Sequence, residues 1–236
     1  MSDKLKLPCH PACFDFLTVN CQLSTNNCHP ATGNRPIPSY LRLMMFRLKL
    51  PTDPRWVNLA EMSLEEILTD HAYCEQKAAS TCISLIQKYS DKQKLVEELA
   101  PIVTEEWGHF RMVLAELKSR KLELGRQRKD EYVNRLRQFI RKGNYEDQLL
   151  DELLVAAMIE ARSCERFRLL SEKLEEAPLR KFYRLFMESE AGHYTLFMKL
   201  AKEYAAPKKV DARWKQLLET EKEIIHSLDL KGERMH

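Results

Sequence analysis

The sequence predicts an all-α protein built as a four-helix bundle with additional peripheral helices. Leu, Ala, Glu, Lys and Arg are abundant, and only six of the 236 residues are glycine, a composition typical of helical proteins. From about residue 60, apolar residues recur three and four positions apart, as on one face of a helix. Two short turns and one long crossover separate four long segments of this kind, which is a common bundle connectivity.

The first two long helices form the N-terminal half of the predicted bundle. Ser63 and Glu66 have the spacing of a capping box, so we expect a helix to begin there and to run to about residue 89. A second helix is expected over about 91–120. Pro101 should bend this helix rather than end it, because the apolar spacing resumes beyond it.

The other helices follow a basic stretch interrupted by glycine. A third long helix is expected over about 145–173. Pro178 suits the first turn of a fourth helix, which should end near Tyr204. A fifth segment, 210–228, has the pattern of a peripheral helix.

The N-terminal segment has a different composition from the rest of the chain. The first 55 residues hold seven of the ten prolines and four of the seven cysteines. Without a helical or alternating period, residues 1–43 are expected to be an irregular or disordered extension, and residues 44–236 to form the structured domain. The alternative that translation starts at Met44 or Met45, so that the extension is absent from the native protein, stays open.

Targeting and redox signals favour a cytoplasmic protein. No run of 18 apolar residues predicts a membrane span, and no N-terminal stretch resembles a signal peptide. An odd number of cysteines favours reduced thiols over a disulfide framework. The net charge of +3 by itself says little about partners.

One acid-and-imidazole pair occurs twice. "TEEWGHF" (104–110) contains Glu106 and His109, and "ESEAGHY" (188–194) contains Glu190 and His193. The positions three, four and seven residues away from each glutamate are mostly apolar, so both pairs should face the core.

The other two long helices each offer one glutamate with small or apolar neighbours, Glu75 and Glu160. Glu75 lies 15 residues before the turn at Ser90 and Glu106 lies 16 after it. At 1.5 Å per residue both are roughly 22–24 Å from that turn, so they should meet across the hairpin. Glu165 shares its face with charged residues and is expected at the surface.

Four carboxylates in one core require a counter-charge. Two of them about 4 Å apart repel by about 4 kcal/mol at an effective dielectric constant of about 20. Two divalent iron or manganese ions would supply that charge. One glutamate from each of two helices and Glu-x-x-His from each of the others is the dinuclear arrangement of ferritin-like bundles. The predicted ligands are Glu75, Glu106, His109, Glu160, Glu190 and His193.

Two further residues have open roles. His71 shares the face of Glu75, so it is either a group that supports the metal ligands or a hydrogen-bonded core histidine. Glu105 either orients a ligand histidine or is an exposed acid.

The crossover is strongly basic. Residues 118–143 contain ten Lys or Arg and three acids, with Tyr132 and Phe139 interleaved. Such a run is either a solvated face or a footprint for a phosphate backbone, and Arg162, Arg166 and Arg168 would extend that footprint. The candidate contacts to a nucleic acid are Arg126, Arg128, Lys129, Arg135 and Arg137.

Several stretches together resemble one bacterial family. They are "DHAYCEQKAAS" (70–80), "EEWGHF" (105–110), "IEARSCERF" (159–167), "FYRLFMESEAGHY" (182–194) and "LAKEY" (200–204). The similarity is to the tRNA 2-methylthio-N6-isopentenyladenosine hydroxylases (MiaE) and covers about 46–226. The ligand pattern of that family falls on the six residues named above.

The resemblance implies a non-haem di-iron monooxygenase domain over 44–236. It implies two iron ions, O2 as co-substrate and hydroxylation of the isopentenyl side chain beside the tRNA anticodon. Electrons would come from a reductase or a ferredoxin-like partner. The rival interpretations are another ferritin-like di-iron oxygenase, an iron-oxidising or iron-storage bundle, and a metal-free helical RNA-binding module.

Overall fold

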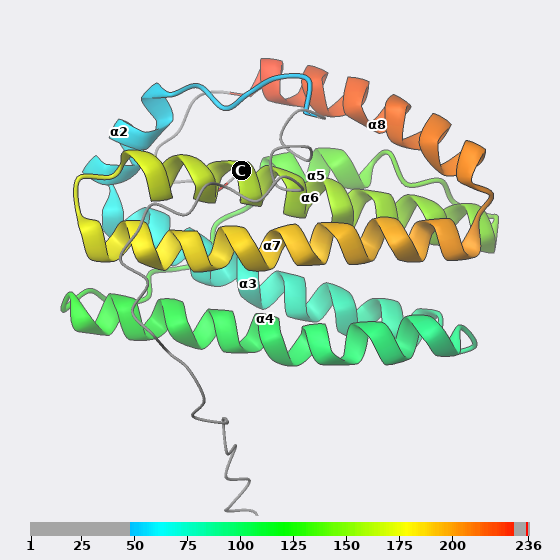
Figure 1. Cartoon of the computed structure of the whole chain (residues 1–236), viewed down its shortest axis with the longest axis horizontal. Coiled ribbons are helices and arrows are strands. Elements are labelled where there is room, and N and C mark those ends of the chain that lie inside the picture. Colours follow the sequence, from blue (N-terminus) through cyan, green and yellow to red (C-terminus); the bar gives the residue numbers. More distant parts are fainter. Residues whose placement is uncertain (1–47, 229–234, 236) are drawn as a thin grey trace, which may run out of the picture. The chain divides into compact units, whose positions relative to one another are not determined.

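The computed structural model describes residues 48–228 and Met235, so the predicted irregular segment 1–43 lies outside the described residues and stays a prediction. The described part is helical and contains no strand (Figure 1). Its helices are α2 (Arg55–Met62), α3 (Leu64–Lys88), α4 (Gln93–Ser119), α5 (Glu131–Arg137), α6 (Tyr145–Lys173), α7 (Ala177–Tyr204) and α8 (Pro207–Ser227). The predicted all-α bundle is therefore confirmed.

Two helical hairpins make the bundle. Helix α3 packs along α4 and α6 packs along α7, each pair joined by a short turn (Figure 1). Helices α5 and α8 contact each other and the outer side of α6. None of the helices in the described ranges is long and apolar enough to cross a bilayer.

Local signals explain the starts of α6 and α7. Asn144 caps α6 by accepting a hydrogen bond from the Asp147 amide (2.8 Å), and Pro178 occupies the first turn of α7 as expected. Helix α4 continues through Pro101, which cannot donate to the Glu97 carbonyl four residues earlier; both residues are exposed.

The predicted capping box at Ser63 is wrong. Its side chain makes no capping hydrogen bond, although α3 begins at the next residue. Ser63 also ends α2, donating its own amide to Ala60, and its ψ of 40° is not the extended conformation that a capping residue needs. Helix α2 itself was not predicted, since its eight residues are too short for a clear period.

The crossover between the hairpins is fastened to α3. The Gly125 amide donates to Thr69 Oγ1 (3.2 Å), and the Tyr73 hydroxyl donates to the Gly125 carbonyl (3.0 Å). A Cβ at Gly125 would lie 3.3 Å from the Thr69 methyl group, so this close approach favours glycine. Arg128 then donates to the Glu66 carbonyl (3.2 Å). These contacts hold the basic segment against the helix that carries Glu75.

Glu165, expected at the surface, is buried, and so are Arg162 and Arg166. The fully buried Arg162 guanidinium contacts Glu165 (2.5 Å) and Glu221 of α8 (2.5 Å). It also donates to the Leu50 carbonyl (3.0 Å). Arg162 therefore joins α6 to α8 and to residues 48–54, and neither of the two buried arginines extends a basic surface.

Candidate metal centre

Side chains from all four long helices meet in the middle of the bundle. Helices α3 and α6 each contribute one glutamate, and α4 and α7 each contribute a glutamate and the histidine three residues later. These are the six residues that the sequence predicted: Glu75, Glu106, His109, Glu160, Glu190 and His193. Their potential ligand atoms fall into two groups, and within each group they lie within 4.8 Å of one another.

The first group comprises Glu75, Glu106, His109 and Glu190. His109 Nδ1 lies 3.3 Å from Glu75 Oε2 and 3.3 Å from Glu106 Oε2. Glu190 Oε1 is 3.9 Å from the same nitrogen, although it belongs to the opposite hairpin.

The second group comprises Glu106, Glu160, Glu190 and His193. His193 Nδ1 lies 2.9 Å from Glu106 Oε1 and 3.3 Å from Glu190 Oε2. Glu106 and Glu190 thus belong to both groups, while Glu75 and Glu160 each belong to one. This sharing is the arrangement that two neighbouring cations with bridging carboxylates would need.

Burying four ionised carboxylates in one cluster is energetically unfavourable. The four carboxylates are all buried, with Glu160 the most accessible at 7%. Burial, reinforced by the charge of Glu190, raises the pKa of Glu75 and of Glu160 well above the usual range. Without cations these two groups therefore tend to hold protons.

The two histidines offset part of the negative charge of the carboxylates. Burial alone would lower the pKa of His109, but hydrogen bonds with Glu106 and Glu75 raise it to about 10. Burial alone would raise the pKa of Glu106, but hydrogen bonds from His109 and His193 lower it to about 2. The imidazolium charge and the protonation of carboxyl groups therefore reduce the negative charge that metal ions would otherwise neutralise.

His71 and Glu105 lie next to the cluster. The fully buried His71 places Nε2 2.8 Å from Glu75 Oε1, and its ring packs against Phe186 with 4.5 Å between centroids. Glu105 is 46% exposed, yet its Oε2 lies 3.4 Å from His193 Nε2, and its Oε1 accepts a hydrogen bond from Ser189 (2.6 Å). His71 therefore contacts one member of the cluster, whereas Glu105 also lies 4.0 Å from His109 Nε2 and is at the same time an exposed acid.

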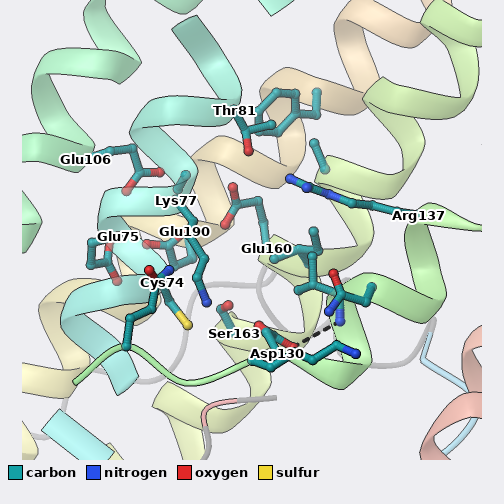
Figure 2. Close-up of a pocket in the computed structure, with 18 of the residues that line it drawn as sticks. Cys74, Glu75, Lys77, Thr81, Glu106, Asp130, Arg137, Glu160, Ser163 and Glu190 are labelled. Carbon is teal, nitrogen blue, oxygen red and sulfur yellow. Dashed lines mark hydrogen bonds between the residues drawn. The ribbon is translucent and has the colours of Figure 1, made fainter. Parts of the chain in front are cut away.

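A cavity of about 460 Å³ leads to the cluster (Figure 2). All four glutamates contribute to its lining, with Ala78, Ala156, Ile159 and Phe197 as apolar wall residues. The crossover lines another part of it through Gln127, Arg128, Lys129, Asp130, Val133, Asn134 and Arg137. The basic segment and the carboxylate cluster therefore share one cavity.

The five basic residues predicted to contact nucleic acid fall into two groups in the structure. Arg128, Lys129 and Arg137 line the cavity, whereas Arg126 and Arg135 are not among its lining residues. Arg135 is held by Glu131 (2.7 Å).

Sequence reasoning missed several cavity residues, most of them on one face of α3. Cys74, Lys77, Ala78 and Thr81 line the cavity together with Ser163 of α6. Of the α3 residues, Ala78 is three positions from Glu75, whereas Cys74, Lys77 and Thr81 are one, two and six positions from it, so the face analysis around Glu75 does not reach these three.

Known proteins resemble the chain over most of its length. The model of the family tRNA-(MS[2]IO[6]A)-hydroxylase (MiaE) matches residues 40–236. A tRNA 2-(methylsulfanyl)-N(6)-isopentenyladenosine(37) hydroxylase of Pseudomonas putida is 39% identical, over 77% of this chain and 88% of its own length. A protein of Salmonella typhimurium with the same name is 28% identical, over 81% and 88% respectively.

A solved structure shares the fold. Protein 43 from Synechococcus, with aldehyde deformylating oxygenase activity, superposes with a TM-score of 0.76 and 35% identity. The match covers 80% of this chain and 94% of that one. The ferritin-like bundle expected from the sequence is thereby confirmed. Together, the matched residues and the two related hydroxylases show that the chain belongs to the MiaE family.

Proposed function

We propose that this protein is an O2-dependent di-iron hydroxylase of tRNA. Its substrate would be the isopentenyl side chain of 2-methylthio-N6-isopentenyladenosine beside the anticodon. The observation that carries this proposal is the position of the two ligand groups, which share Glu106 and Glu190 and border a cavity lined by basic residues. The names of the related hydroxylases point to the same substrate.

The donor set fits two iron ions. Glu75 and His109 would hold one ion and Glu160 and His193 the other, with Glu106 and Glu190 between them. Carboxylate and imidazole donors suit iron or manganese, and two buried carboxyl groups with raised pKa values gain from a nearby cation. Bound iron supplies the oxygen chemistry at an unactivated C–H bond that amino-acid side chains lack.

The protein's own residues would bind and orient the reactants. Ala78, Ala156, Ile159 and Phe197 give the cavity apolar surface that suits an isopentenyl chain. His71 would fix the orientation of Glu75, and Glu105, anchored by Ser189, would fix that of His193. Arg128, Lys129 and Arg137 would attract the phosphates that flank the target nucleotide.

Hydroxylation with O2 needs two electrons from outside the protein, so we also propose a reductase or ferredoxin-like partner. We propose the cytoplasm as the location of the reaction, because tRNA is its proposed substrate.

Nucleoside mass spectrometry tests the proposal directly. In cells without this gene we expect the hydroxylated isopentenyl nucleoside to disappear and its unhydroxylated precursor to accumulate. Return of the intact gene should restore the product, whereas a Glu106→Gln variant should not. An unchanged nucleoside profile would reject the proposed substrate.

The Synechococcus structure motivates a second candidate, deformylation of an aldehyde by an oxygenase reaction in the same cavity. Purified, iron-loaded protein supplied with a long-chain aldehyde and a reducing system would distinguish the two, because this candidate predicts turnover without RNA. The basic cavity residues favour the tRNA substrate.

A further inference from the structure

Lys77 of α3 is a cation inside the cavity for which the bundle supplies no hydrogen-bond acceptor. Its Nζ is buried, and no acceptor among the described residues lies within hydrogen-bond distance of it. Burying an ammonium group without a partner is unfavourable, so a residue in this position calls for an explanation. Lys77 lines the same cavity as Glu75, which precedes it by two residues on α3.

The size of the cavity limits what enters it. A volume of about 460 Å³ lies within the usual range for one small ligand. It suits a single base with its side chain, but not a stack of several nucleotides. A target base would therefore leave the stack of the anticodon loop to enter, as bases do in other enzymes that modify them.

The order of the residues along the cavity then indicates which part of the nucleotide each of them would contact. The isopentenyl chain must reach the four glutamates, and the phosphates remain near the cationic residues of the crossover. The adenine ring lies between these ends, as does Lys77, which Figure 2 shows between the carboxylates and Asp130. An ammonium group only donates hydrogen bonds, and unprotonated adenine ring nitrogens only accept them.

We propose that Lys77 is a specificity-determining residue that donates a hydrogen bond to a ring nitrogen of the target adenine once that base has entered the cavity. This inference rests on the proposed function and deepens it, because it names the group that recognises the base. The cations of the crossover bind phosphates in this scheme, whereas Lys77 binds a neutral heterocycle.

Binding measurements with Lys77→Met test the assignment. The probes are an anticodon stem–loop RNA that carries 2-methylthio-N6-isopentenyladenosine and the free modified nucleoside. We expect Lys77→Met to bind both about 10- to 100-fold more weakly than wild type, as for the loss of a hydrogen bond to a charged group. The salt dependence of RNA binding should not change, because a neutral base releases no counterion.

Two other variants provide the comparison. Lys88→Met removes a lysine of the same helix that pairs with Glu152 and does not line the cavity, and it should bind both probes like wild type. Arg137→Gln should instead lower the salt slope of RNA binding by about one unit and leave the affinity for the free nucleoside unchanged. Equal helical circular dichroism and equal iron content in all variants would exclude misfolding.

Three results would overturn the inference. One is unchanged affinity of Lys77→Met for the nucleoside, and another is a fall of its salt slope by one unit, which would place Lys77 on a phosphate. The third is a wild-type protein that neither binds nor hydroxylates the modified stem–loop, which would also reject the proposed function. The first two results leave wild-type hydroxylation intact, so the two failures are distinguishable.

Discussion

Glu160→Gln should change the stability of the protein in opposite directions with and without metal. Glu160 and Glu190 offer ligand atoms that lie within 4.8 Å of each other in the buried cluster. At that distance two ionised carboxylates repel by about 3 kcal/mol at an effective dielectric constant of about 20. Proton uptake relieves part of this repulsion, so we expect Gln to stabilise the metal-free protein by about 2 kcal/mol near pH 8.

The pH dependence follows from the direction of the pKa shift. The pKa of Glu160 is raised in the folded state by burial and by Glu190, so the folded state binds this proton more tightly than the unfolded state does. Stability from that proton is present at low pH and is lost as pH rises through the folded-state pKa. The advantage of Gln should therefore grow between pH 6 and pH 8.

Urea unfolding of chelator-treated protein at pH 6, 7 and 8 measures this difference. Glu172→Gln removes an exposed acid of the same helix that pairs with Arg168, and it should change stability by less than about 0.5 kcal/mol. With iron or manganese present, wild type should gain more stability than Glu160→Gln, which lacks one carboxylate donor. A metal-free Glu160→Gln protein that is less stable than wild type at pH 8 would refute the electrostatic argument.

Four further outcomes are expected. Glu75→Gln should keep about one metal ion per chain by elemental analysis, whereas Glu106→Gln should weaken both positions, because Glu106 belongs to both ligand groups. Metal affinity measured by competition with a chelator should rise at least about tenfold per pH unit between pH 6 and pH 8, because His109, with its pKa raised to about 10, must lose a proton to bind metal. Arg162→Met should cost about 3–5 kcal/mol in urea unfolding, since it leaves its buried acidic partners unpaired. Charge removal at Arg135, which Glu131 holds outside the cavity lining, should lower the salt slope of tRNA binding less than removal at a cavity-lining arginine.

The bundle and the convergence of the six cluster residues were predictable because both depend on helix geometry alone. Two glutamates at equal distances from a turn meet across a hairpin, whatever surrounds them, as Glu75 and Glu106 do. That these residues bind iron stays a prediction.

Features that depend on contacts between distant segments were not predictable in the same way. Glu165 has charged neighbours on its own helix, which is typical of a surface position. Its burial arises because residues 48–54 cover that face, where the Thr52 amide donates to Glu165, and because Glu221 of α8 binds Arg162, the partner of Glu165 on its own helix. Lys77 was missed for a different reason, since the search was restricted to acids and histidines.

The attachment of the crossover at Thr69, Tyr73 and Gly125 has an evolutionary consequence. The two hairpins supply the six candidate metal ligands, while the crossover that joins them supplies one wall of the cavity. Changes in the crossover would then alter which molecules gain access and leave the reactive centre as it is. Exchange of segment 121–144 between members of the superfamily should accordingly transfer substrate preference from one protein to another.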